Sequence, residues 1–479
     1  MRHHAAVHDG GTLRRVLLLA LLGVAPLFAG AVHEPVFVPL LLGCSLAGAA
    51  AWARARRLVR EGRSVPPLPG GHLLLAAHAL VLLQLLPLPP AVLRLVSPGS
   101  YALYDRLQLT PPLTAWRPIS VSPPDTLRGL AFLAGFSLLY LAVFRDLGAA
   151  PWRRRLAGTV VVAGLVLTVE AFAQAASSDP LRIWGVWKPR WDWGVFGAYV
   201  NRNHFAGYLV MATALAFGFA LEGLARLHHE WQRRRHGFLA LGERAGNAAV
   251  RSCAAAMVLV AGLVASTSRG GISAFAAAGL LLPLATRQRR RTALAVVALA
   301  SLGVAWIGLG GFVSAFGRGV KASRLDLWAD MLAIVPRFPL FGVGWNAFST
   351  AYPWYQTVWR NDWIGEAHNE YLQVLLDTGL AGLVVFLALL ATVFRRALAR
   401  AARSPLDLGL FGALLGMALH NLVEFNWQIP ANAATWVALA ALACREGEPG
   451  SSDRPPSAGE HGPGRESSSR LLEAAARAT

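Results

Sequence analysis

Three arginines, Arg202, Arg269 and Arg324, each lie beside a long apolar run of the sequence. A guanidinium group at such a position has few partners other than an anion, and its planar fork of donors fits phosphate bidentately. Arg269 lies between Ser268 and Gly270, and the glycine permits close approach of the backbone to a ligand. An arginine that pairs with lipid phosphate is the simpler alternative at each position. Arg269 in particular indicates a site for a phosphorylated ligand.

Arg324 begins a segment that has the spacing of an amphipathic helix. Apolar side chains recur every three or four residues at Leu325, Trp328, Leu332 and Val335. This spacing predicts a helix on the membrane surface, with Arg324 one turn from Trp328. An ordinary interfacial arginine is equally typical of such a helix.

His368 is the residue best suited to exchange a proton near neutral pH. Glu366 and Glu370 flank it, and Asn369 follows it directly. A carboxylate here could orient the imidazole or act as the base itself. A polar entry to a helix has the same composition, so the sequence leaves the choice between His368 and Glu370 open.

Two further polar clusters lie at the edges of apolar runs, at 199–204 and 420–426. The first contains Asn201, Asn203 and His204, for which we expect a supporting role. Both clusters are first of all typical of helix-capping groups.

The composition excludes a soluble multidomain protein. Only 15% of the 479 residues are charged and 55% are hydrophobic, and the mean hydropathy is +0.45. Soluble domains carry about 25% charged residues. The fold class predicted is therefore an all-α polytopic membrane protein.

Apolar runs long enough for membrane helices predict about twelve spans. Several of these runs are short. They lie near 16–32, 35–53, 72–88, 127–145, 156–176, 204–223, 248–266, 271–286, 293–313, 374–394, 405–423 and 430–444. The first run is longer than a signal-peptide core and a second follows at once, so we expect an uncleaved anchor.

The basic residues predict the orientation of the chain. With the N-terminus in the cytoplasm, about two thirds of the 45 Lys and Arg residues fall on the inner side. This predicts cytoplasmic termini and a working face outside, and it explains the net charge of +19 without nucleic acid. We expect one transmembrane domain over 1–444, with a large outer loop at 314–373 that contains short amphipathic helices. The polar, Ser- and Pro-rich segment 445–479 is predicted to be a disordered cytoplasmic tail.

The sequence lacks the motifs that are typical of several kinds of chemistry. The chain has no phosphate-binding glycine loop, no His-Glu-x-x-His and no Asp-x-Asp pair. Its three cysteines, Cys44, Cys253 and Cys444, form neither a disulfide framework nor a metal cluster. An enzyme on the outer face has no supply of nucleotides. If this protein transfers a group there, the donor must arrive already activated, for which a lipid is the suitable carrier.

The polar clusters together resemble the O-antigen ligase and polymerase superfamily of bacterial envelope enzymes. His368-Asn369, nine further residues and Gly379-x-x-Gly382 are similar to that family's H-[NSQ]-x9-G-x-x-G pattern. The other matching features follow in the family's order: 201–204, 268–271, and the Arg324…Trp328 segment with 339–344 after it. The family's Arg-x3-Leu element is Arg324-x3-Trp328 here, which departs from the pattern of true ligases. The resemblance covers roughly 190–430.

The resemblance implies an inverting, metal-independent glycosyltransferase without a cofactor, on the periplasmic face of the bacterial inner membrane. The donor it implies is a glycan on undecaprenyl diphosphate, and the acceptor is lipid A–core, another lipid-linked glycan or a protein hydroxyl. Arg269, Arg324 and Arg202 would bind the diphosphate. His368 would deprotonate or orient the acceptor hydroxyl, with Glu370 as the rival base.

A transporter or flippase of lipid-linked glycan is the alternative function. Transporters place ionisable groups near the middle of the bilayer. Here deep charges are few, and the polar clusters gather at one predicted face. This distribution favours chemistry at the membrane surface.

Overall fold

The computed structural model describes residues 2–108, 112–190, 194–234, 244–285, 322–357 and 363–445. Within these ranges every regular element is a helix, and β pairing is limited to three isolated bridges. The α-helices are α1 (Arg2–Val24), α2 (Glu34–Arg60), α3 (Gly71–Leu85), α4 (Pro90–Val96), α5 (Pro98–Leu107), α6 (Pro123–Asp146), α7 (Ala150–Ala175), α8 (Arg202–Arg234), α9 (Arg244–Ala265), α10 (Arg269–Leu281), α13 (Ala322–Ile334), α14 (Phe348–Ala351), α15 (Glu370–Ala401), α16 (Pro405–His420) and α17 (Pro430–Cys444). Short 3-10 helices are η1 (Ala25–Leu27), η2 (Ala29–Ala31), η4 (Leu282–Ala285), η5 (Val335–Arg337), η6 (Tyr352–Trp354) and η7 (Asn426–Gln428).

Six of these helices are long and apolar enough to cross a membrane: α2, α6, α7, α8, α9 and α15. Four shorter apolar helices, α3, α10, α16 and α17, coincide with four more of the predicted spans. The predicted span at 16–32 corresponds to the end of α1 and the 3-10 turns after it. The span at 293–313 and the tail at 446–479 lie outside the described residues. An all-helical polytopic membrane protein is confirmed, whereas the number twelve stays a prediction.

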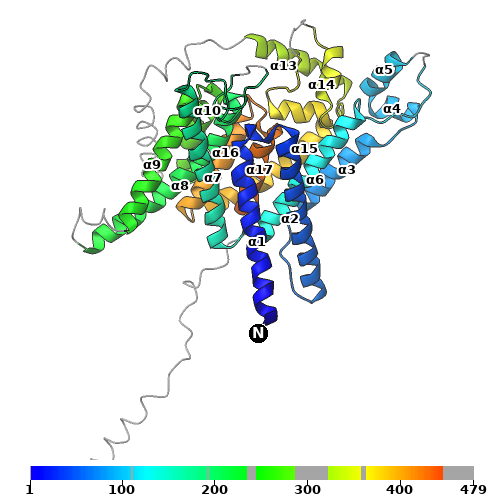
Figure 1. Cartoon of the computed structure of the whole chain (residues 1–479). Helices are drawn as coiled ribbons and strands as arrows, with labels where there is room; N and C mark the ends of the chain where they lie inside the picture. The colour runs from blue at the N-terminus through cyan, green and yellow to red at the C-terminus, as the bar shows by residue number, and fades with distance from the viewer. Residues whose placement is uncertain are drawn as a thin grey trace, which may run out of the picture. The chain divides into compact units, whose positions relative to one another are not determined.

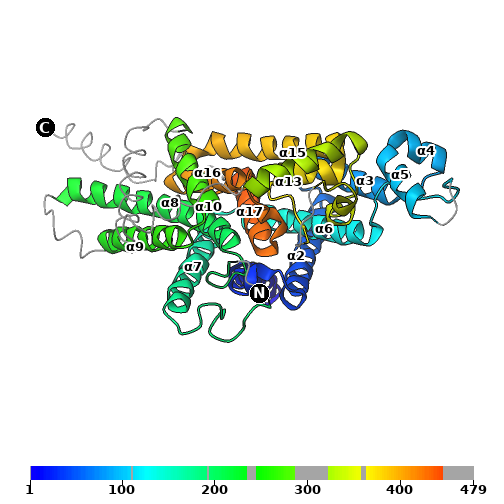
Figure 2. The same ribbon diagram turned by 90° about the horizontal axis from the view of Figure 1, so that it is seen from above.

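The helix α17 occupies the centre of the helical bundle. It contacts α1, α6, α7, α8, α15 and α16, and nearly all of its residues are buried. Figure 2 shows α17 enclosed among these helices. Its sequence is rich in alanine, which lets neighbouring helices approach closely. The connection between α16 and α17 is therefore anchored in the middle of the protein.

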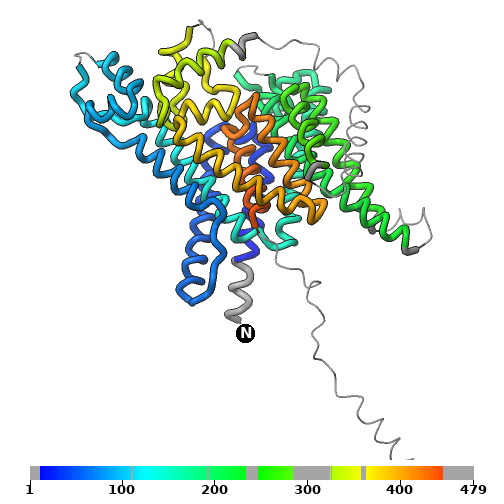
Figure 3. Tube along the Cα trace, turned by 180° about the vertical axis from the view of Figure 1, so that it is seen from behind, coloured from blue at the N-terminus to red at the C-terminus, as the bar shows by residue number. Residues whose placement is uncertain are grey.

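The remaining contacts form two flanks around this centre. On one flank α8 packs against α9 and α16, and on the other α2 packs against α6. The helices α3 and α15 lie side by side in the view from behind (Figure 3). The short helices α13 and α14 lie together at one end of the bundle (Figure 1).

The helix predicted to begin near Arg324 is confirmed as α13, but the predicted apolar face was wrong in part. Leu327, Met331 and Ile334 form its buried side, whereas Leu332 is 56% exposed. These three side chains pack into a small core of their own with residues that follow α13. Apolar residues occur on both sides of this helix, so periodicity alone does not identify the side that the following loop covers.

Candidate active site

The Glu424 carboxylate lies at the centre of the candidate site, in the connection between α16 and α17. Its Oε1 accepts hydrogen bonds from Asn203 Nδ2 at 2.7 Å and from Arg324 Nη2 at 2.7 Å. Its Oε2 lies 3.4 Å from His368 Nδ1 and 4.0 Å from His204 Nε2. Glu424 itself is only 1% exposed. One buried carboxylate thus brings together side chains from α8, α13 and the loop before α15.

The charge state of Glu424 determines how His368 can act. Burial alone would raise the pKa of Glu424, but the hydrogen bond to His368, the charge that His368 can carry and the positive charge of Arg324 outweigh it and lower the pKa to about 2. An ionised carboxylate only accepts hydrogen bonds, so His368 Nδ1 must carry the proton. The lone pair of the neutral imidazole is then on Nε2, which is the form that a general base requires.

The loop around His368 holds this residue in an uncommon backbone conformation. His368 has a φ of +50°, in the left-handed region that few residues other than glycine adopt. Trp328 Nε1 donates to the Ala367 carbonyl at 2.8 Å, and Gln373 Oε1 accepts from the Ala367 amide at 2.7 Å. Asn369 then caps α15 with its side-chain oxygen. These bonds offset the cost of about 1–3 kcal/mol that such a backbone carries.

Arg202 and Arg269 lie at the turn between α9 and α10. Arg269 is the first residue of α10, and Ser268 caps this helix by accepting a hydrogen bond from Gly271 N at 3.3 Å. Arg202 Nη1 donates to Thr267 Oγ1 at 3.2 Å. Arg202 of α8 and Arg269 of α10, two of the predicted phosphate-binding arginines, therefore both adjoin this turn.

Gly270 joins this turn to the connection that carries Glu424. A Cβ atom on Gly270 would lie 3.0 Å from Val423 Cγ2, so a larger residue would push the two segments apart. Arg324 Nη1 donates to the Val423 carbonyl at 2.8 Å. The start of α10, with Arg269, and the Arg324 side chain thus contact the same turn.

The start of α8 is positioned by polar contacts of its own. Asn201 Oδ1 accepts a hydrogen bond from Asn203 N at 2.8 Å. Asn432 Nδ2, from the buried centre of α17, donates to the His204 carbonyl at 2.9 Å. The rings of His204 and Phe425 meet edge to face. These contacts orient Asn203 toward Glu424.

Gly379, the first glycine of the His–Gly pattern, bends α15 where another loop binds it. Gly379 has φ +63° and ψ −166°, which interrupts the helical backbone. Leu380 N then donates to Pro339 O at 2.9 Å, and Ala381 N donates to Leu340 O at 3.1 Å. A Cβ atom on Gly379 would lie 2.4 Å from the Leu340 carbonyl group. The bend therefore requires glycine, and it attaches the loop after α13 to the helix that follows His368.

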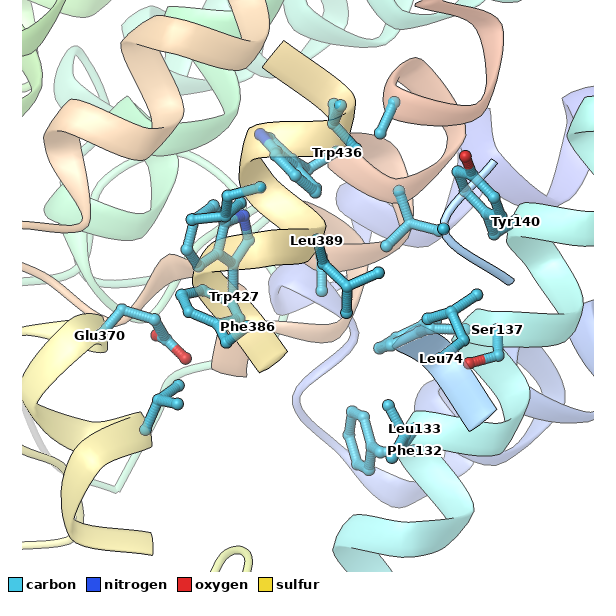
Figure 4. Close-up of a pocket in the computed structure, with 18 of the residues that line it drawn as sticks. Leu74, Phe132, Leu133, Ser137, Tyr140, Glu370, Phe386, Leu389, Trp427 and Trp436 are labelled. Atoms are coloured by element: carbon cyan, nitrogen blue, oxygen red, sulfur yellow. The ribbon is translucent and has the colours of Figure 1, made fainter. Parts of the chain in front are cut away.

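The side chain of Glu370, the alternative base, faces a cavity and not the Glu424 carboxylate. Its Oε1 accepts a hydrogen bond from Gln428 Nε2 at 2.8 Å, and it lines a cavity of about 360 Å³. Figure 4 shows Glu370 at one side of this cavity, near Trp427 and Phe386. The other labelled lining residues are mostly apolar or aromatic: Leu74, Phe132, Leu133, Ser137, Tyr140, Leu389 and Trp436. Glu366 also lines the cavity, and burial together with the nearby carboxyl groups raises its pKa well above the ordinary value.

The predicted site residues thus form three groups. Those that meet at Glu424 are Arg324, His368, Asn203 and His204. Those in or beside the adjoining turns are Arg202, Arg269, Ser268, Gly270 and Asn201, while Trp328 and Asn369 hold the His368 loop. Glu370 forms the third group by itself, because its side chain bonds to Gln428 and lines the apolar cavity. Glu424 was missed because its cluster was assigned to helix capping, although an acidic residue at the edge of an apolar run is itself a signal.

His204 and His368 both face Glu424, but the three side chains are not arranged as the ligands of a metal ion. No group of three or more His, Cys, Asp or Glu residues that could hold a metal ion occurs in the part of the chain that the structure describes.

This arrangement defines a class: a polytopic helical membrane protein with a cationic, imidazole-containing site built on helix ends. A family model described as O-Antigen ligase matches residues 254–387. The matched region contains Arg269, Arg324, His368 and the bend at Gly379. Over this region the chain is therefore similar to the O-antigen ligase family, as the motifs predicted.

A second comparison finds a similar sequence in a protein of polysaccharide production. The chain is 30% identical over 144 residues to the exopolysaccharide production protein ExoQ of Rhizobium meliloti (strain 1021). The alignment covers 26% of this chain and 32% of the relative, so the chain spans about a third of that protein's length.

Proposed function

We propose that this protein transfers a glycan from an undecaprenyl diphosphate carrier to an acceptor hydroxyl in the synthesis of cell-surface polysaccharide. The observation that carries the proposal is the convergence of Arg324 and His368 on Glu424, inside or beside the matched family region. The acceptor is lipid A–core, another lipid-linked glycan or a protein hydroxyl. The reaction takes place at the periplasmic face of the bacterial inner membrane, and both chain termini are cytoplasmic.

His368 is the proposed general base. Its Nδ1 faces Glu424, so Nε2 is available to remove the proton from the acceptor hydroxyl. The acceptor oxygen forms a bond to the anomeric carbon while the bond from that carbon to the phosphate oxygen breaks. A single displacement of this kind inverts the configuration at the anomeric carbon. Glu424 stabilises the imidazolium that forms, as a buried carboxylate does in other catalytic pairs.

The arginines are the proposed binding site for the diphosphate. The electron pair of the broken bond stays on the diphosphate, and Arg324, Arg269 and Arg202 neutralise this charge. Arg324 is held in advance by Val423 and Glu424, so little reorganisation is needed when the charge develops. Removing one such group costs about 10²–10³ in rate.

The apolar cavity beside Glu370 is the proposed location of the carrier's isoprenoid chain. It lies between α3, α6, α15 and α17, and its walls are mainly aliphatic and aromatic. The connection between α16 and α17 contacts both the cavity and the imidazole, because Gln428 lines the cavity and Glu424 faces His368. Lipid and diphosphate could therefore occupy opposite sides of one short segment.

Deletion of the gene, followed by complementation, tests the proposal in cells. Loss of all glycan attachment indicates a ligase, whereas a single capped repeat indicates a polymerase. Accumulation of lipid-linked glycan on the cytoplasmic side would instead support the transporter alternative. With purified protein, transfer should continue in the presence of EDTA; a loss that added metal restores would contradict the metal-independent mechanism.

A further inference from the structure

A second cationic cluster lies at the far end of α6, away from the candidate active site. The Asp146 carboxylate pairs with Arg14 of α1 and with Arg54 of α2. Arg15 Nε donates to the Asp146 carbonyl at 2.9 Å. Three arginines therefore bind one aspartate, two through its carboxylate and one through its backbone carbonyl.

Two more guanidinium groups adjoin this cluster. Arg145 and Arg445 lie on the Phe144 ring, 5.3 Å and 5.4 Å from its centroid, and close enough to repel each other. Arg145 is also close enough to repel Arg54. Among the described residues, Asp146 is the carboxylate recorded in an ion pair with this group, so the cluster carries a net positive charge.

The guanidinium group of Arg145 has buried donor atoms without acceptors in the described ranges. Its Nε and Nη1 atoms are buried, and neither has a hydrogen-bond partner within the described residues. Buried guanidinium donors are costly unless an acceptor binds them. An anion that binds Arg145 would also reduce the repulsion among the neighbouring arginines.

An apolar groove extends from the same place. It has a volume of about 800 Å³ and lies between α1 and α2, with Arg14 among its lining residues. Within α1 its wall extends from Leu13 to Val24 and includes Leu17 and Ala20. A helical stretch of this length spans about 18 Å, which exceeds the roughly 15 Å of one membrane leaflet.

We propose that this groove and the arginine cluster form a binding site for an anionic diacyl phospholipid. One acyl chain of the lipid lies in the groove between α1 and α2, and the lipid phosphate binds Arg14 and Arg145. Charge complementarity favours an anionic headgroup over a zwitterionic one, because five arginines surround a single carboxylate. The site is independent of the proposed glycan transfer.

The test is native mass spectrometry of the full-length protein in detergent, titrated with phosphatidylglycerol, with phosphatidylcholine of the same acyl chains, and with inorganic phosphate. We expect wild-type protein to bind phosphatidylglycerol at least about fivefold more tightly than phosphatidylcholine. Arg145→Gln should remove most of this preference. The matched control is Arg57→Gln, because Arg57 also lies near the end of α2 but is exposed and pairs only with Glu61 in the described contacts.

A groove variant tests the acyl chain separately. Ala20→Trp should weaken binding of phosphatidylglycerol, because an indole ring would fill the groove that Ala20 lines. Equal binding of the two lipids to wild-type protein would overturn the proposal, and this measurement does not depend on the folding of any variant. A preference that Arg145→Gln leaves intact, or competition by inorganic phosphate as effective as competition by the lipid, would overturn it as well.

Discussion

His368 Nδ1 lies 3.4 Å from Glu424 Oε2, although the two residues are 56 positions apart in the sequence. The polar residues at 420–426 and His368 therefore belong to one site. The pairing fixes the imidazole tautomer.

Replacing Glu424 by glutamine should lower the rate of transfer. The amide can turn its nitrogen toward His368 Nδ1, which then becomes the acceptor and leaves the proton on Nε2. We expect the turnover number to fall by at least about a hundredfold. The measurement is transfer by purified protein at saturating donor, with Glu222→Gln as the control. Glu222 is also a paired carboxylate of the bundle, and it lies twenty residues along α8 from Arg202. Wild-type turnover in Glu424→Gln would show that the pairing has no part in the chemistry.

The depressed pKa of Glu424 predicts how stability depends on pH. The folded-state pKa of about 2 lies below the ordinary value of 4.5. Glu424 therefore contributes stability that is fully present above about pH 4.5 and is lost as the pH falls toward 2. The melting temperatures of wild type and Glu424→Gln should differ most above pH 4.5 and converge below it. A difference that stays constant from pH 7 to pH 2.5 would contradict this assignment.

Replacing Gly379 by alanine should destabilise the loop that binds α15. The new Cβ would lie 2.4 Å from the Leu340 carbonyl group, and the backbone φ of +63° is unfavourable for alanine. We expect a loss of folding stability of at least about 1 kcal/mol, together with lower activity, because this loop binds the helix that follows His368. Gly158→Ala in α7 is the matched control, since no atom lies within 4 Å of its Cβ position. Equal melting temperatures for the two variants would argue against the close contact at Gly379.

The separation of Glu370 from Glu424 predicts which residue is the base. Glutamine at position 370 can keep the hydrogen bond to Gln428, so Glu370→Gln should retain activity within about tenfold of wild type. His368→Ala should lose about a hundredfold or more. Rates of the two variants with the same donor and acceptor decide between them. The opposite order of activities would identify Glu370 as the base.

Most of the helical architecture follows from the sequence. Apolar runs such as those at 127–145 and 374–394 coincide with α6 and α15, because a helix in lipid must satisfy its own backbone groups. The sequence also predicts a binding role for the arginines at positions 202, 269 and 324, since a cation beside an apolar run needs a partner. That role stays a prediction.

The contacts between distant segments could not be predicted in the same way. Glu424 has a position typical of a capping residue, and only the packing of α8, α13 and α16 brings it to His368. His368 and Glu370 are two positions apart, yet the helix start at Glu370 directs the second side chain toward Gln428. Side-chain direction at a helix start depends on how the loop enters it, which spacing alone does not determine.

Transfer by purified protein tests the central claim most directly, with a defined undecaprenyl-diphosphate glycan as donor and a lipid-linked acceptor. Wild type, Arg324→Ala and His368→Ala are compared after each has been shown to be folded and inserted. We predict that both variants lose at least about a hundredfold in turnover, because one lacks a ligand for the leaving diphosphate and the other lacks the base. Wild-type turnover in both variants would contradict the account.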